Sequence, residues 1–97
     1  MFRLFLTAEA KRTLESLQRS PSDAKRYKAV VKALKFLAQN PRHPGLQTHE
    51  FTSLEGPRGE KIFEAYAEQA TPAAYRIFWY YGPHQKEITV FTITAHP

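Results

Sequence analysis

The hydrophobic pattern changes its period once along the chain, and this change limits the possible folds more than any other feature. Between residues 7 and 40, apolar side chains recur every three or four positions, which is the spacing of helices with one buried face. From Gln47 onward they follow the period of two that is typical of strands. A loop rich in Pro, residues 41–45, separates the two parts. The sequence therefore predicts an α+β fold with its helices before most of the sheet.

A short strand and two helices are expected before the loop. Met1–Leu6 reads as the strand, and the hydroxyl of Thr7 is well placed to cap a first helix that ends near Arg19. Ser20-Pro21 predicts the start of the second helix, with Ser as the cap and Pro at the first helical position. Asn40-Pro41 predicts its end. Because the connection is short, the two helices are expected to lie antiparallel.

The second half of the chain predicts an antiparallel meander of four strands joined by short turns. The last two strands are apolar on both faces, so we expect them at the centre of the sheet. The strand containing Glu64 alternates, and its polar side is expected to face an open surface. The four strands are predicted over Gln47–Leu54, Lys61–Gln69, Tyr75–Tyr81 and Glu87–His96. The predicted core contains Phe5, Leu14, Leu17, Tyr27, Val31, Leu34, Ile77, Trp79, Val90 and Phe91.

The length of 97 residues predicts a single domain over residues 1–97. There is no cysteine, which excludes disulfides and thiolate chemistry and fits a reducing compartment. The apolar start is far shorter than a membrane span of roughly 20 residues and lacks the cleavage region of a signal peptide. We therefore expect a soluble, cytoplasmic protein that does not bind a membrane.

The net charge of +5 is concentrated in the first half of the chain. No acidic residue occurs from Ala24 to His49, and the second helix has a row of lysines on one face. Such a row favours a polyanion or an acidic protein segment as a partner. A solvated face that keeps the protein soluble is the alternative. The lysines of this row, expected to hold RNA by its backbone, are Lys25, Lys28, Lys32 and Lys35.

The sequence lacks the glycine-rich motifs of nucleotide sites and the histidine spacing of metal sites, so no cofactor and no metal are expected. It does contain the residue types for metal-independent cleavage of RNA: a base, an acid and a fixed cation. Each also has a structural alternative, such as an ion pair of Arg76 with Glu64 or Glu68, or a merely exposed His96 near the terminus. The candidates are Arg76, His96, Glu64 and Glu50 for catalysis, with His49 and Tyr66 for RNA binding.

Several local motifs, taken in order, resemble the RelE/ParE superfamily of bacterial toxins from type II toxin-antitoxin systems. The resemblance covers nearly the whole chain. Its motifs are Leu37-Ala38-Gln39-Asn40-Pro41, His43-Pro44-Gly45-Leu46, Leu54-x-Gly56, Tyr75-Arg76-Ile77-Phe78 and Ile93-x-x-His96. It implies a RelE-like fold and a cognate antitoxin as partner, and leaves the oligomeric state open.

The resemblance implies cleavage of messenger RNA on the ribosome, with Arg76 binding phosphate and His96 in an acid-base role. Glu64 stands where many such members have basic residues, and no Tyr follows His96. Two other functions stay open at this point: inhibition of DNA gyrase, which other members of the superfamily carry out, and partner binding without chemistry.

Overall fold

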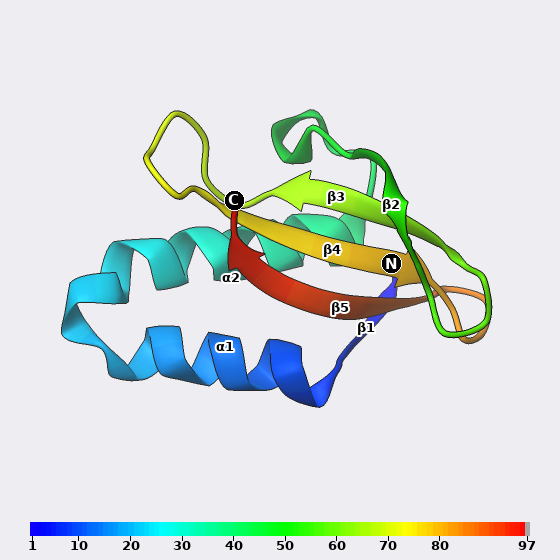
Figure 1. Ribbon diagram of the computed structural model, residues 1–97, viewed down its shortest axis with the longest axis horizontal. Helices are drawn as coiled ribbons and strands as arrows, with labels where there is room; N and C mark the ends of the chain where they lie inside the picture. The colour runs from blue at the N-terminus through cyan, green and yellow to red at the C-terminus, as the bar shows by residue number, and fades with distance from the viewer. Residues whose placement is uncertain (97) are drawn as a thin grey trace.

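In the computed structural model, which describes residues 1–96, two helices lie against one face of a five-stranded sheet (Figure 1). The strands follow the order β1-β5-β4-β3-β2. Short 3-10 turns occupy Pro21–Asp23 and Pro44–Leu46. The helices and strands are β1 (Arg3–Leu6), α1 (Ala8–Arg19), α2 (Ala24–Gln39), β2 (His49–Glu55), β3 (Lys61–Tyr66), β4 (Tyr75–Tyr81) and β5 (Glu87–Ala95).

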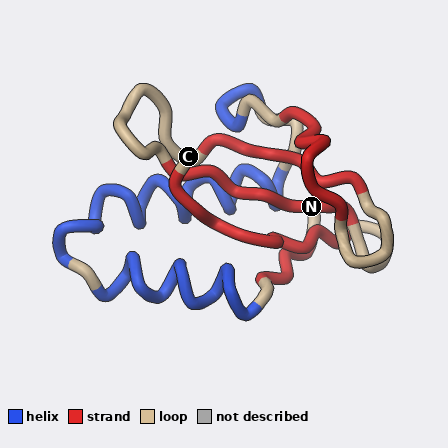
Figure 2. The backbone as a smooth tube through the Cα atoms, viewed as in Figure 1, coloured by secondary structure: helices blue, strands red, loops and turns tan. Residues whose placement is uncertain are grey.

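The sheet confirms the predicted meander and adds one parallel pair. The pairs β2-β3, β3-β4 and β4-β5 are antiparallel, and β4 and β5 lie inside the sheet as their apolar faces predict. β1 joins the sheet parallel to β5, with Leu4 opposite Ile88. The tube in Figure 2 shows both helices on the same side of the strands. We call the uncovered side of the sheet the open face.

The helices bury the larger of two apolar clusters against the sheet. Side chains from α2, such as Val30 and Leu37, pack with Ile77 and Trp79 of β4. Of the predicted core residues, five are buried: Leu17, Leu34, Ile77, Trp79 and Val90. Leu14, Tyr27, Val31 and Phe91 are half-buried.

Phe5 is 40% exposed, so its prediction as a core residue was wrong. Leu4 and Leu6, its neighbours in β1, pack against the helix-covered cluster, and alternation along a strand directs the residue between them to the other side.

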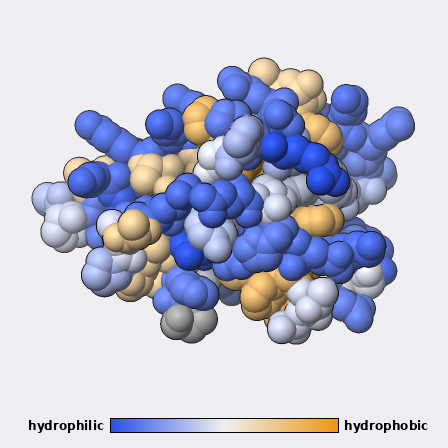
Figure 3. Space-filling model, turned by 90° about the horizontal axis from the view of Figure 1, so that it is seen from above, coloured by the Kyte–Doolittle hydropathy of each residue, from blue (hydrophilic) through white to orange (hydrophobic). Residues whose placement is uncertain are grey.

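A smaller apolar cluster lies on the open face. Ile62, Phe78 and Tyr80 form its buried part, and Phe51 and Phe91 pack against them. The ring of Phe51 meets that of Phe78 edge-on, with centroids 5.0 Å apart. Seen from above, the surface is mainly hydrophilic with small separate apolar areas (Figure 3). The open face, which the helices do not cover, therefore has a small buried apolar cluster of its own.

The helix ends follow the sequence except at Ser20. Thr7 Oγ1 accepts a hydrogen bond from Ala10 N at 3.1 Å, which confirms the predicted cap of α1. The predicted cap by Ser20 is wrong, because its hydroxyl pairs with that of Ser22 and the chain makes a 3-10 turn before α2 begins. α2 ends at Gln39, as Asn40-Pro41 predicts. Within residues 1–96, no helix has the length and apolar character needed to cross a membrane.

Candidate functional site

Four of the predicted site residues meet on the open face where β2, β3 and β4 run side by side. The register places His49 opposite Glu64 and Tyr66 opposite Arg76. Glu64 and Tyr66 are two positions apart in β3, so their side chains project from the same side of the sheet. We call His49, Glu64, Tyr66 and Arg76 the open-face cluster.

Arg76 is a buried member of the cluster, with 7% of the residue exposed, and its neighbour Glu64 is 5% exposed. Its Nε lies 3.7 Å from Glu64 Oε2, and its Nη1 donates a hydrogen bond to Glu68 O at 3.1 Å. The guanidinium carbon is 3.8 Å from the centroid of the Tyr66 ring, which covers it. Arg76 Nε is buried without a hydrogen-bond partner in the described part of the chain. The predicted ion pair with Glu64 is thus formed, and Arg76 makes its contacts with protein groups.

His49 is the exposed member of the cluster. Its side chain is 49% exposed, and its Nε2 lies 2.8 Å from Glu64 Oε1. Its Nδ1 is 3.2 Å from Gln47 O. A carboxylate and a carbonyl both accept hydrogen bonds, and an imidazole donates from both nitrogens only when it is protonated. The geometry therefore fits an imidazolium above a carboxylate that also neutralises Arg76.

His96 continues the ladder beside the cluster. Its backbone N donates to Ala74 O at 2.8 Å, so it occupies the position opposite Ala74 just beyond β5. That position is diagonal to Arg76, and diagonal neighbours in antiparallel pairs have Cα atoms about 7–8 Å apart. His96 is exposed. The structure thus brings His96 to the same end of the sheet as Arg76, three strands away from His49.

Glu50, which the sequence predicted as a catalytic residue, does not join the cluster. It lies opposite Phe63, and Phe63 packs with the helix-covered core. Side chains alternate along a strand, so Glu50 follows His49 on the other side of β2. The two adjacent polar residues that the sequence placed together therefore separate onto different faces.

The four lysines predicted to hold RNA also lie away from the cluster. They are exposed on α2, and α2 packs against the sheet face opposite to the open face. Lys32 comes as far as the edge near the end of β3, where it lines a groove together with Tyr66. A single RNA phosphate bound at Arg76 therefore cannot also contact the lysines of α2. These lysines are Lys25, Lys28, Lys32 and Lys35.

Sequence reasoning missed the contact between Arg26 and Glu68, which supports the cluster from α2. Arg26 Nε donates to Glu68 Oε1 at 2.8 Å, and Tyr75 N donates to the same oxygen at 3.0 Å. The hydrogen bond to Glu68 raises the pKa of Arg26 above its ordinary value. Glu68 was the other expected ion-pair partner of Arg76. Its backbone carbonyl accepts a hydrogen bond from Arg76, and its carboxylate forms an ion pair with Arg26. The sequence held no signal for this contact, because Asp23 lies three residues before Arg26 and offers it a local partner at 4.0 Å.

The open-face cluster can transfer protons and attract an anion. His49 is an exposed acid-base group held by a carboxylate, an arrangement that fixes the orientation of the ring. When His49 is protonated, the three charged side chains of the cluster carry a net positive charge, and this charge lies at the surface. Within residues 1–96, no three His, Asp or Glu side chains come close enough together to hold a metal ion.

Comparison with known proteins gives likenesses in structure alone. The sequence matches no protein-family model and no curated protein. The fold is similar to that of the YoeB/ParE toxin from Agrobacterium tumefaciens, at 14% identity over 99% of this chain and 100% of that chain, with a TM-score of 0.73.

Two further structures are similar. The archaeal RelE-RelB complex from Pyrococcus horikoshii OT3 aligns at 17% identity, covering 97% of this chain and 93% of that chain, with a TM-score of 0.65. A copper-bound mutant toxin from Helicobacter pylori aligns at 14% identity, covering 99% and 96%, with a TM-score of 0.64. The chain therefore has the α+β fold of RelE/ParE-type toxins.

Proposed function

We propose that the protein is the toxin of a type II toxin-antitoxin pair and that it cleaves messenger RNA on the ribosome without a metal. The fold similarity to the YoeB/ParE toxin and to the RelE-RelB complex supports a toxin with a cognate antitoxin as its partner. The cytoplasm, where translating ribosomes are found, is the proposed location. A single domain over residues 1–97 carries the activity.

The observation that carries the proposal is the position of His49 on Glu64, above Arg76. Glu64 neutralises Arg76, and Tyr66 covers the guanidinium, so the exposed charge of the cluster is that of His49. A phosphate that approaches the open face therefore meets the imidazolium first. In this arrangement Arg76 keeps Glu64 in place beneath the imidazole, and Tyr66 borders the RNA.

The proposed reaction uses the RNA's own 2′-hydroxyl. A base removes its proton, the oxygen attacks phosphorus, and the bond to the 5′-oxygen breaks as an acid protonates that oxygen. The products are a 2′,3′-cyclic phosphate and a 5′-hydroxyl end. We assign removal of the 2′-hydroxyl proton to His96 and protonation of the leaving 5′-oxygen to His49, and these two histidines lie on either side of Arg76 along the open face. Correctly placed acid-base groups each accelerate such a step by about 100-fold or more.

Inducible expression with sequencing of RNA 5′ ends tests this function. Wild-type protein is expected to produce new 5′-hydroxyl ends within translated messages, and His49→Ala and Arg76→Ala to abolish them. His84→Ala is the matched control, because His84 is an exposed histidine in the turn at the other end of β4 and β5. An unchanged profile of 5′ ends on induction of the wild type would reject RNA cleavage.

The burial of Arg76 favours a second candidate, a toxin that binds DNA gyrase without performing chemistry. A guanidinium already paired with Glu64 and covered by Tyr66 is suited to holding the strands together. This candidate predicts that purified protein blocks the supercoiling of plasmid DNA by gyrase. It also predicts that His49→Ala still blocks supercoiling. The RNA-cleavage proposal predicts instead that the same substitution abolishes the activity.

A further inference from the structure

Two acids contact Arg76, and they do so with different groups. Glu64 offers a carboxylate oxygen, Oε2, which lies 3.7 Å from Arg76 Nε. Glu68 offers its backbone oxygen, which accepts a hydrogen bond from Arg76 Nη1 at 3.1 Å. Both acids are largely shielded from solvent, because 7% of the Glu64 side chain and 14% of the Glu68 side chain are exposed. The ion pair of Arg76 with Glu64 is therefore one of two that the local structure could form.

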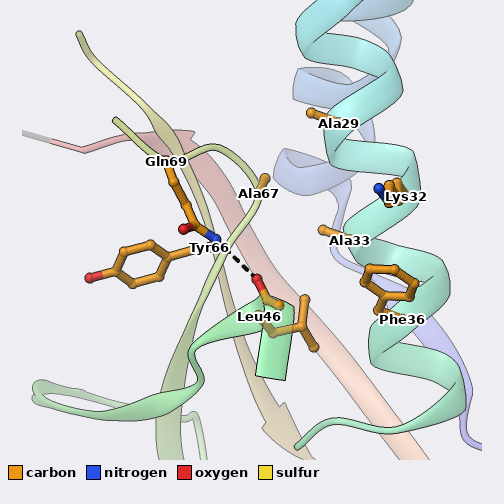
Figure 4. Close-up of a pocket in the computed structure, with 9 residues that line it drawn as sticks. Ala29, Lys32, Ala33, Phe36, Leu46, Tyr66, Ala67 and Gln69 are labelled. Carbon is orange, nitrogen blue, oxygen red and sulfur yellow. Dashed lines mark hydrogen bonds between the residues drawn. The ribbon is translucent and has the colours of Figure 1, made fainter. Parts of the chain in front are cut away.

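The carboxylate of Glu68 is engaged by Arg26 of α2. Ala29 points from α2 towards the end of β3 (Figure 4), and Arg26 lies one turn before it. Arg26 Nε donates to Glu68 Oε1 at 2.8 Å, and Tyr75 N donates to the same oxygen at 3.0 Å. The guanidinium carbon of Arg26 is 4.7 Å from the centroid of the Tyr75 ring. Hydrogen bonds between charged groups are stronger than neutral ones, so Arg26 fixes where this carboxylate points.

The contact between Arg76 and Glu64 is less favourable in its geometry. At 3.7 Å it is longer than a hydrogen bond, and Arg76 Nε has no hydrogen-bond partner in the described part of the chain. Without Arg26, the Glu68 carboxylate loses its positive partner. Arg76 already touches the Glu68 backbone and is a neighbouring cation. A direct hydrogen bond to a carboxylate stabilises a guanidinium, so Arg76 is then expected to turn towards Glu68.

We propose that Arg26 is a positioning residue that determines which carboxylate Arg76 pairs with. Arg26 engages Glu68 and so leaves Arg76 to Glu64, which stays 2.8 Å from the His49 imidazole. Arg26 belongs to α2, on the side of the sheet opposite to the open face, so it acts through Arg76 and not on the RNA. Its effect on the reaction rests on the proposed RNA cleavage, whereas the choice of carboxylate does not.

Cleavage of messenger RNA on purified ribosomes tests the effect on the reaction. Arg26→Ala is expected to lower the rate at saturating ribosome concentration about tenfold or more, because small displacements within a site have large effects on rate. The ribosome concentration that gives half the maximal rate is expected to stay within about twofold, because the surface that binds the substrate is unchanged. A rate that Arg26→Ala leaves unchanged would overturn the proposal.

A second substitution distinguishes the choice of carboxylate from a general loss of structure. Arg26→Ala/Glu68→Gln removes the competing carboxylate and keeps an oxygen for Tyr75 N, so the rate is expected to return to within about threefold of the wild type. Arg26→Ala/Asp23→Asn is the matched control, since Asp23 Oδ1 lies 4.0 Å from Arg26 Nη1. It restores the same net charge by removing an acid near Arg26 instead of one that contacts Arg76. Its rate is expected to stay as low as that of Arg26→Ala.

The NMR signal of the Arg76 Nε–H group reports the pairing without any RNA. We expect its chemical shifts to change in Arg26→Ala and to return to the wild-type values in Arg26→Ala/Glu68→Gln. An Arg76 signal that does not change in Arg26→Ala would overturn the proposal, as would a rate that stays low in Arg26→Ala/Glu68→Gln. If the wild type cleaves no RNA, the proposed function fails, and the Arg76 signal still decides whether Arg26 sets the pairing. Circular dichroism of each variant confirms that it is folded.

Discussion

His49 and Glu64 form a direct link between the solvent and the buried guanidinium of Arg76. The Nε2 to Oε1 distance is 2.8 Å, and the second carboxylate oxygen faces Arg76 Nε at 3.7 Å. Glu64 is therefore a buried acid that lies between a guanidinium and an imidazole. Glu64 in this position has two effects: it stabilises the fold and it orients the exposed ring of His49. Unfolding measurements detect the first effect and activity measurements the second.

Glu64→Gln is expected to destabilise the protein by about 3 kcal/mol, because it leaves the buried charge of Arg76 without its counter-charge. The amide keeps the shape of the side chain, so the loss comes from charge and not from packing. Urea unfolding measures the effect. The matched control is Glu60→Gln, which removes an acid that pairs with Arg58 at 3.3 Å in the exposed turn between β2 and β3. Equal unfolding midpoints for the two variants would contradict the structural role of Glu64.

Arg26→Ala is expected to loosen the start of β4. The substitution removes the donor that holds the Glu68 carboxylate, which in turn accepts from Tyr75 N. A partly exposed pair of this kind contributes up to about 1 kcal/mol, so exchange of the Tyr75 amide is expected to accelerate about fivefold. Hydrogen exchange followed by NMR measures this rate. Arg58→Ala is the control, and an unchanged rate in Arg26→Ala would show that Glu68 needs no support from α2.

The order of the elements could be predicted because each period is local to its own segment. The change from helical to strand spacing, the cap at Thr7 and the stop at Asn40-Pro41 are all read from a few neighbouring residues. The pairing of β1 with β5 could not be read in this way. It joins the two ends of the chain, and a four-residue strand carries no signal for its partner.

Only part of the candidate site could be predicted, because the sequence shows which residue types are present but not always where the fold places them. The alternation of β3 correctly predicted that Glu64 and Tyr66 lie on one side of the strand. Arg76 lies opposite Tyr66 on the neighbouring strand. The placement of Glu50 needed the register of β2, which a strand at the edge of the sheet does not reveal. The placement of the lysines depends on which face of the sheet α2 covers. A helical pattern does not show this, because it shows only that one face of the helix is apolar.

Thr7→Val is expected to destabilise the protein by about 1–2 kcal/mol. The Thr7 hydroxyl accepts from Ala10 N at 3.1 Å and donates to Phe91 O at 2.8 Å, so it caps α1 and ties it to β5. Valine keeps the branched shape and loses both hydrogen bonds. Thr7→Ser keeps the hydroxyl and is expected to retain most of the stability. Thermal unfolding of the two variants makes the comparison, and a Ser variant as unstable as the Val variant would assign the effect to packing.

His96→Gln separates catalysis from structure more sharply than any substitution within the open-face cluster. His96 is exposed, and the contact that fixes its position is a backbone hydrogen bond from its N to Ala74 O, which glutamine retains. Stability is therefore expected to stay within about 0.5 kcal/mol of the wild type. If His96 transfers a proton during cleavage, the rate at which 5′-hydroxyl ends appear after induction falls about 100-fold. His49→Gln is expected to lower both quantities, because it also removes the imidazole that pairs with Glu64 at 2.8 Å. His84→Gln, in the turn at the far end of the sheet, should change neither. Full cleavage by His96→Gln together with complete loss in His49→Gln would remove His96 from the reaction and leave the paired imidazole of His49 as the acid-base group of the open face.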